Sequence, residues 1–373
     1  MKYDTIVIGL GCVGSSTIYE LSKYNANVLG IEQFNTPNDM GSSHGSSRIM
    51  RLAYHEGGKY VPLLYDAIEK WIELEKYANE KLFYQNGSLT IGLPESDKFK
   101  YSKKTCDEFD IPYKYVNSNQ LSNQFPEWNI PSNFKAFYQP EGGVLDNNIC
   151  IKTQIKEAKN NGVDIHTNER VINWEKKNSE IIVKTNKHTY KTESLVISSG
   201  PWAKNHIDVL SDILKIERHV AGYLEMKSSA SFEKSNFPAW IMDTGSRKFY
   251  GLPKHKSECI KIGDTTNKDI ISDMTKFNRK VINSEIESIR KFCDKYIQSD
   301  LNRVNKKISC PLTNTPDGDF IIDEIENNIF IGVGLSGHGF KLSNIIGIVL
   351  SDLIQDGKTD YNIKPFKLNR FDI

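Results

Sequence analysis

The feature that most constrains the fold is a glycine-rich turn near the N-terminus. Gly9, Gly11 and Gly14 have the spacing GxGxxG and come directly after the β-rich apolar run Thr5–Ile8. Apolar residues then recur at helical spacing, and a second apolar run, Asn27–Ile31, follows. This order predicts a strand, a tight turn, a helix and a second strand, which together form a βαβ unit. We therefore expect an α/β fold with a Rossmann-like domain.

The same residues predict a dinucleotide site. The first glycine permits the tight turn, the second lets the backbone approach a pyrophosphate, and the third lets helix and strand pack closely. The helix N-terminus directs free N–H groups at the phosphates. Glu32 ends the second strand, where a carboxylate accepts hydrogen bonds from a ribose and would repel the 2′-phosphate of NADP. The motif leaves FAD and NAD open, and a purely structural glycine turn is the alternative.

Length and charge exclude other classes. At roughly 100–200 residues per domain, 373 residues suggest two or three domains. The 48 basic and 47 acidic residues leave a net charge of +1, so we expect no nucleic acid and no anionic membrane as partner. No apolar run reaches the roughly 18 residues of a membrane helix. Asp4 interrupts any N-terminal signal sequence, so a cytoplasmic protein is expected. Its six scattered cysteines are predicted to be free thiols, and no metal site is expected.

The remaining segments alternate between the two element types, without a linker between domains. Helices are expected from Pro62 onward and over Asn147–Asn161, 271–298 and Leu342–Ile354. Strands are expected over Val163–His166, Val171–Val183, Leu195–Ser199, much of 216–263, and Ile329–Val333. Residues 35–58 are expected to form a loop, 81–140 strands and loops, and Gly334–Gly339 a glycine-rich turn.

Several longer motifs occur in a fixed order. They are MKYDTIVIGLGCVG at the start, GSSHGSSRIMRLAYHEG at 41–57, KFYGLP at 248–253, KIG at 261–263, SCPLTNTPDGDFIID at 309–323 and GLSGHGFK at 334–341. With them, the chain from Met1 to about Phe371 resembles monomeric sarcosine oxidase and N-methyltryptophan oxidase, within the glycine/D-amino-acid oxidase group of flavoenzymes.

The resemblance implies FAD rather than NAD, and oxidation of a secondary amine, normally an N-methyl amino acid such as sarcosine or N-methyltryptophan. O₂ would be the electron acceptor and give H₂O₂, and the imine would hydrolyse to amine and aldehyde. It also implies a discontinuous FAD-binding domain of residues 1–80, 141–215 and 311–373. A mixed-sheet substrate domain would comprise residues 81–140 and 216–310.

The resemblance further assigns roles to individual residues. Cys310 falls where the family links its flavin covalently, and Lys261 where a lysine activates O₂. Arg51 and Lys341 match the residues that bind the substrate carboxylate, and a guanidinium suits this because it forks onto both oxygens. Arg48 and His44 match positions that line the flavin, and Tyr250 matches a tyrosine of the substrate pocket. The expected cofactor contacts are Gly9, Gly11, Val13, Gly14, Glu32, Gln33, Val171, Gly200, Gly337 and Gly339.

Two positions depart from the sarcosine-type pattern. Thr265 stands where the family has a histidine, and Leu312 where it has a tyrosine. Both changes make the pocket less polar, so a larger N-alkyl amino acid, a cyclic imino acid or a fructosyl amino acid is an alternative substrate. An FAD dehydrogenase with another electron acceptor, a flavin-binding protein without turnover and an NAD(P)-linked dehydrogenase are the alternatives in other classes.

Overall fold

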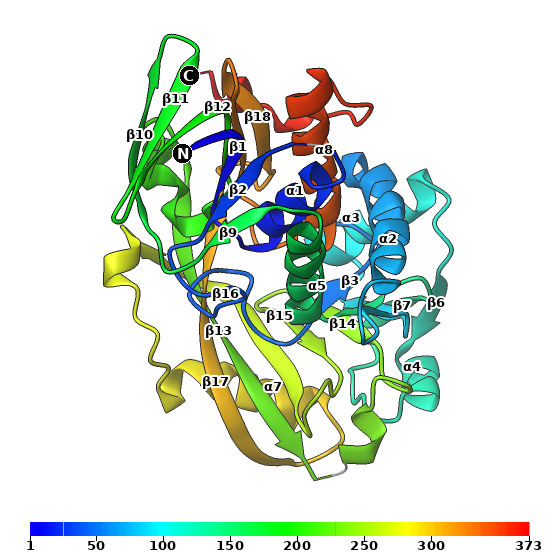
Figure 1. The fold of residues 1–373 in the computed structure, drawn as a ribbon. Helices are drawn as coiled ribbons and strands as arrows, with labels where there is room; N and C mark the ends of the chain where they lie inside the picture. The colour runs from blue at the N-terminus through cyan, green and yellow to red at the C-terminus, as the bar shows by residue number, and fades with distance from the viewer. Residues whose placement is uncertain (25, 228, 373) are drawn as a thin grey trace.

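Two large β-sheets organise the computed structural model of the protein, which describes residues 1–24, 26–227 and 229–372 (Figure 1). The first sheet contains the predicted βαβ unit, β1 (Lys2–Ile8), α1 (Cys12–Leu21) and β2 (Val28–Ile31). Its other strands are β9 (Asp164–His166), β10 (Val171–Lys177), β11 (Glu180–Thr185), β12 (Thr189–Ile197), β18 (Ile321–Glu326) and β19 (Ile329–Val333).

The centre of the first sheet is parallel and covered on both faces. β1 pairs in parallel with β2 and β12, and β12 with β19. Helices α1, α5 (Asn147–Asn160) and α8 (Ser343–Asp356) lie together on one side of it (Figure 1). Ile6 and Val7 point to opposite faces of β1 and both are fully buried, as expected for a parallel sheet between two layers.

The second sheet is mixed and mostly antiparallel. Its strands run in the order β17, β13, β16, β15, β14, β5, β7 and β6. Among the described residues, β14 and β5 form its one parallel pair. Their bounds are β5 (Ser88–Gly92), β6 (Lys114–Asn117), β7 (Lys135–Gln139), β13 (Lys215–Met226), β14 (Ala239–Asp243), β15 (Lys248–Leu252), β16 (Ile260–Ile271) and β17 (Leu301–Asn314). Helix α7 (Glu287–Tyr296) packs on this sheet, with Phe292 stacked on Trp240.

Smaller elements connect the two sheets. A three-stranded sheet combines β3 (Arg48–Met50), β8 (Gly143–Leu145) and β4 (Phe83–Tyr84). The other α-helices are α2 (Val61–Glu75), α3 (Asp97–Glu108), α4 (Ser118–Gln124) and α6 (Leu210–Ile213). Short 3₁₀ turns occupy Gly58–Tyr60, Gly200–Asn205, Ser229–Phe232, Met274–Lys276, Asn283–Ile286, Phe340–Leu342, Lys364–Phe366 and Leu368–Phe371. No helix in the described part of the chain is long and apolar enough to cross a bilayer.

The α/β class, the βαβ unit and the helices α2, α5 and α8 are confirmed. The expectation of strands and loops over 81–140 is wrong where α3 and α4 lie. Helix α3 buries Phe99, Ser102, Thr105 and Cys106 at helical spacing, but the two hydroxyl residues conceal the apolar period. The helix expected over 271–298 begins as a 3₁₀ turn only at Asn283, and the loop at 35–58 contains β3, which forms by pairing with distant β8.

Candidate functional site

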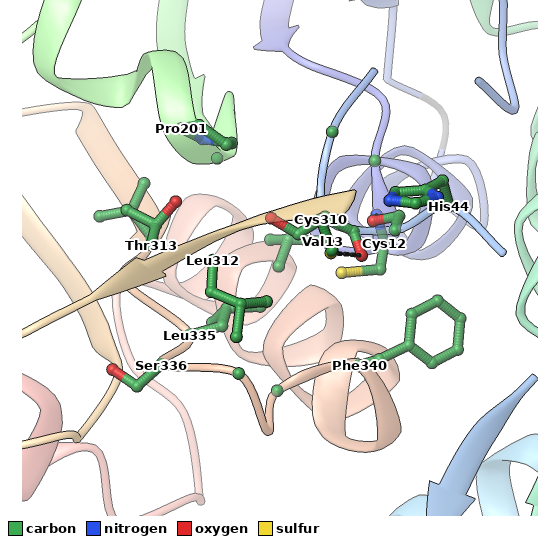
Figure 2. Close-up of a pocket in the computed structure, with 18 of the residues that line it drawn as sticks. Cys12, Val13, His44, Pro201, Cys310, Leu312, Thr313, Leu335, Ser336 and Phe340 are labelled. Atoms are coloured by element: carbon green, nitrogen blue, oxygen red, sulfur yellow. Dashed lines mark hydrogen bonds between the residues drawn. The ribbon is translucent and has the colours of Figure 1, made fainter. Parts of the chain in front are cut away.

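A cavity of about 860 Å³ lies between the two sheets. Its walls come from the N-terminus of α1, the loop at 41–48, the strands β15, β16 and β17, and the turn at 334–341. Figure 2 shows Cys310 and Leu312 on β17 facing the same space as Cys12, His44 and Phe340. Every residue to which the sequence assigned a role, except Gly14, lines this cavity.

The glycine turn is packed too closely for side chains. A Cβ on Gly14 would lie 1.8 Å from the carbonyl oxygen of Gly9, and one on Gly9 would lie 2.7 Å from the Cα of Ser199. Gly9 also has a φ of 87°, which favours glycine. At Gly11 the nearest atom is the Ser43 Oγ at 3.3 Å, a contact that a small shift of the serine side chain would relieve, so packing constrains this glycine less than Gly9 and Gly14.

Glu32 is fixed beside this turn. One carboxylate oxygen accepts a hydrogen bond from the Leu10 N–H (2.9 Å) and the other from the Phe34 N–H (3.0 Å). Burial raises its pKa, and the backbone donors oppose that shift. Each oxygen keeps a lone pair for a further donor, as a ribose requires. Gln33, Val171 and Gly200 line the cavity nearby.

Several polar atoms in the cavity wall lack a partner. Among the described residues, His44 Nε2, Ser199 Oγ and Thr313 Oγ1 are buried and form no hydrogen bond. A buried polar atom left unpaired costs about 1–3 kcal/mol. These atoms therefore indicate a polar ligand that lies along the cavity.

Arg48 holds the loop at 41–48 in place. Its guanidinium donates to the carbonyl oxygens of Ser42 (2.8 Å), His44 (2.6 Å) and Ser47 (2.9 Å). Burial and the Arg48 charge lower the pKa of His44 to about 3, so the imidazole is neutral at pH 7. The side chain of Arg48 therefore supplies positive charge, and that of His44 supplies a neutral donor or acceptor.

Arg51 directly follows β3, and Lys341 follows the glycine-rich turn. Their side chains lie close together, both over the ring of Tyr54. Arg51 donates to both carboxylate oxygens of Glu56 (2.5 and 2.8 Å) and to the Ala53 carbonyl. Lys341 Nζ donates to the His338 carbonyl (2.7 Å) and the Tyr54 hydroxyl (3.3 Å). Burial and the Arg51 charge lower the pKa of Lys341 to about 7.

Lys261 lies on β16 and contacts the loop at 41–48 that Arg48 holds in place. Its Nζ is buried and donates to the Ser47 carbonyl at 3.4 Å. Burial and the Arg48 charge lower its pKa to about 7. In the described part of the chain, no carboxylate forms an ion pair with Arg48, Lys261 or Lys341. These three cations therefore line the cavity without an ion pair of their own.

Cys310 lies near two of these cations, Arg48 and Lys261. Burial raises the pKa of its thiol, and the charges of Arg48 and Lys261 oppose the shift. Its Sγ lies 3.8 Å from the Ser42 carbonyl oxygen. Tyr250 on β15 lies near Cys310. Burial raises the pKa of its hydroxyl, and a negative charge on Cys310 would raise that pKa further.

Comparison with known proteins identifies the family. The sequence profile described as FAD dependent oxidoreductase matches residues 4–353. Monomeric sarcosine oxidase of Bacillus sp. (strain NS-129) is 30% identical, over 99% of this chain and 97% of its own length. N-methyl-L-tryptophan oxidase of Yersinia pestis (strain Pestoides F) is 31% identical, over 100% of both chains. The chain belongs to the FAD-dependent oxidoreductase family. In fold it also matches NikD, an unusual amino acid oxidase, with a TM-score of 0.86 at 18% identity, covering 98% of this chain and 97% of that one.

The cavity fits the FAD of this oxidoreductase family. The glycine turn and α1 N-terminus suit its pyrophosphate, and Glu32 suits its ribose. The unpaired atoms of His44 and Thr313 belong to the wall of the same cavity, and His44 lies near Arg48 and Lys261. Gly337, with a φ of 79°, and Gly339 complete the wall opposite Cys310.

Sequence reasoning missed several residues of this oxidoreductase's site. Glu56, Lys98 and Lys248 line the cavity, and only Lys98 lies outside the quoted motifs, since Lys248 begins KFYGLP. Glu56 lies inside the quoted motif GSSHGSSRIMRLAYHEG, which could have indicated it. His219 faces Cys310 across the β13–β17 pair and contacts Glu217 at 3.1 Å. Among the described residues, no group of His, Cys, Asp and Glu could hold a metal ion.

Proposed function

We propose that this FAD-dependent oxidoreductase oxidises a secondary-amine amino acid of the N-methyl type, with O₂ as electron acceptor. The observation that carries the proposal is a set of three cations around one cavity, the half-buried Arg48 and the buried Lys261 and Lys341, none of which forms an ion pair among the described residues. The names of the sarcosine and N-methyltryptophan oxidases, similar over their whole length, support the substrate class. The products would be H₂O₂ and an imine that hydrolyses to amine and aldehyde.

The substrate carboxylate would bind between Arg51 and Lys341. An ammonium at Lys341 and a forked guanidinium at Arg51 provide several charge-assisted hydrogen bonds to one carboxylate. To reach it, Arg51 must give up at least one of its bonds to Glu56. Tyr250 and Leu312 would enclose the rest of the substrate and exclude water.

FAD, when bound, supplies the acceptor for the two electrons removed from the substrate C–N bond. The chain's contribution is then electrostatic. Arg48 holds positive charge at the cavity wall, where reduction would increase negative charge. The Lys261 ammonium would stabilise the negative charge that O₂ gains, and with a pKa of about 7 its Nζ can also give up a proton near neutral pH.

We also propose that Cys310 holds the flavin covalently. It is one of two cysteines in the cavity, and Arg48 and Lys261 both favour its thiolate. In the same proposal, residues 1–80, 141–215 and 311–373 form the FAD-binding domain, and residues 81–140 and 216–310 the substrate domain. Cys310 would then stand at their boundary.

The test is a screen for H₂O₂ release and O₂ consumption with the FAD-loaded protein. N-methyl amino acids should give both signals, and cyclic and glycated amino acids should be poorer substrates. Flavin reduction without O₂ consumption would show a dehydrogenase instead. No reduction by any amine would refute the proposed function, and preference for a cyclic or glycated amino acid would replace its substrate class.

A further inference from the structure

Two lysines line the cavity on the side of the second sheet and have no role in the chemistry proposed above. Lys98 is the second residue of helix α3, and Lys248 is the first residue of strand β15. Both line the cavity that contains Arg51 and Lys341. Neither forms an ion pair with any residue in the described ranges, and no hydrogen bond from either ammonium is found there.

Lys248 is held toward the substrate end of the cavity by its strand. Its backbone N–H donates to Thr266 Oγ1 (2.8 Å), and its carbonyl oxygen accepts from Thr265 Oγ1 (3.1 Å). Side chains two residues apart on a strand share a face and lie about 7 Å apart. Lys248 therefore lies on the same face of β15 as Tyr250, two residues before it in the strand. The small side chain of Thr265, which also lines the cavity, leaves space beside Lys248 that a larger side chain would fill.

Lys98 interacts electrostatically with both Lys248 and Arg51, one of the two residues expected to bind the substrate carboxylate. Burial lowers its pKa to about 8, and the charges of Arg51 and Lys248 act in the same direction. Glu56 and Asp243 act in the opposite direction. Glu56, however, already accepts two hydrogen bonds from Arg51, and Asp243 Oδ1 accepts one from the Gly245 N–H. Lys98 is thus a partly buried cation beside two other cations, without a carboxylate of its own.

We propose that Lys98 and Lys248 form a second anion-binding subsite, and that the substrate is an N-alkyl amino acid whose side chain carries a carboxylate. The inference rests on the proposed function, because it takes the first carboxylate to lie between Arg51 and Lys341. Lys98 interacts electrostatically with Arg51 and both line the same cavity, so a dicarboxylic substrate such as N-methyl-aspartate or N-methyl-glutamate could reach both subsites. The positive end of the α3 dipole adds to the attraction.

The test compares isosteric substrates in the FAD-loaded full-length protein. N-methyl-aspartate and N-methyl-glutamate should exceed N-methyl-asparagine and N-methyl-glutamine in kcat/KM by about tenfold or more. Lys98→Met and Lys248→Met should each remove most of this preference by raising KM for the acidic substrates, with kcat nearly unchanged. Lys100→Met, an exposed lysine on the same helix, is the matched control and should keep the preference.

A second measurement does not depend on turnover. Succinate should bind about tenfold more tightly than butyrate in a titration of the flavin absorbance, and Lys98→Met should make them equal. Equal use of acidic and neutral N-methyl substrates would refute the subsite and leave the proposed function intact. If Lys98→Met lowers kcat/KM equally for acidic and neutral substrates, Lys98 serves to balance the charge of Glu56. That result would also refute the subsite. If no N-methyl amino acid is oxidised, the proposed function fails, and the succinate titration alone decides the subsite.

Discussion

Arg51 donates two hydrogen bonds to the carboxylate of Glu56, at 2.5 and 2.8 Å, inside the cavity where it is expected to bind substrate. Burial alone would raise the pKa of Glu56, but the Arg51 charge and hydrogen bonds, together with His55 and His338, outweigh it and hold the pKa well below its ordinary value. The glutamate is therefore an anion that competes with any substrate carboxylate for the same guanidinium. In the proposed site it would keep Arg51 paired until a substrate binds.

Glu56→Gln should tighten the binding of acetate about tenfold, because the competing charge is removed. It should also lower the free energy of unfolding by about 3 kcal/mol, because Arg51 is left unpaired in a buried site. Flavin absorbance titration and thermal unfolding measure the two effects. Asp319→Asn is the control, since Asp319 also lines the cavity but bonds to Tyr60 and Lys59. Weaker acetate binding in Glu56→Gln would contradict the competition.

Acetate binding should weaken as the pH rises through about 7. Lys341, with a pKa of about 7, is an ammonium below that pH and a neutral amine above it. The dissociation constant should then rise by up to about tenfold per pH unit. Lys341→Met should bind acetate weakly at every pH and lose much of this slope. An unchanged slope would assign the titration to another group, such as Lys261.

Lys261→Met should leave the anaerobic reduction of flavin by substrate within a few-fold of the normal rate and slow its reoxidation by O₂ about 100-fold or more. The physical reason is the loss of the buried cation beside Ser47 and Arg48. Stopped-flow absorbance measures both half-reactions. Lys306→Met is the control, because Lys306 lies near the same Tyr223 ring but is exposed. Equal reoxidation rates in the two variants would refute the role of Lys261.

Acid precipitation should leave the yellow colour with the protein, and Cys310→Ser should release it into the supernatant. Cys12→Ser is a sharp control, because Cys12 is the other cysteine of the cavity. Intact mass spectrometry should show the added mass of FAD in Cys12→Ser and not in Cys310→Ser. The opposite pattern would move the link to Cys12, and no bound mass in the unmodified protein would refute covalent attachment.

Gly14→Ala and Gly11→Ala should fail in different ways. The new Cβ of Gly14→Ala meets the Gly9 carbonyl at 1.8 Å, so β1 and α1 cannot pack and the protein should lose stability. Gly11→Ala meets only the Ser43 Oγ, at 3.3 Å, so it should keep its secondary structure. It should bind FAD more weakly, because the second glycine of the motif is expected to let the backbone approach the pyrophosphate. Circular dichroism and the FAD-to-protein ratio separate these outcomes. Normal FAD content in Gly11→Ala would place the pyrophosphate elsewhere.

The sequence by itself determined the βαβ unit. The glycine spacing and the apolar runs beside it act through local backbone sterics, and the strand expected at Ile329–Val333 has those bounds in the structure. The motif positions also located most of the cavity wall, since they are short segments that each carry their own chemistry. Helix α3 was missed because Ser102 and Thr105 occupy buried positions that an apolar pattern does not mark.

Only the tertiary structure decided how the charges are paired. Arg51 binds Glu56 within its own loop, whereas Arg48, Lys261 and Lys341, from three distant segments, share the cavity without forming an ion pair in the described part of the chain. Lys98 and Lys248 meet that cavity because α3 and β15 are brought to it by strand pairing across the second sheet. Coulomb interactions depend on distance and burial, and neither is written in the order of residues along the chain.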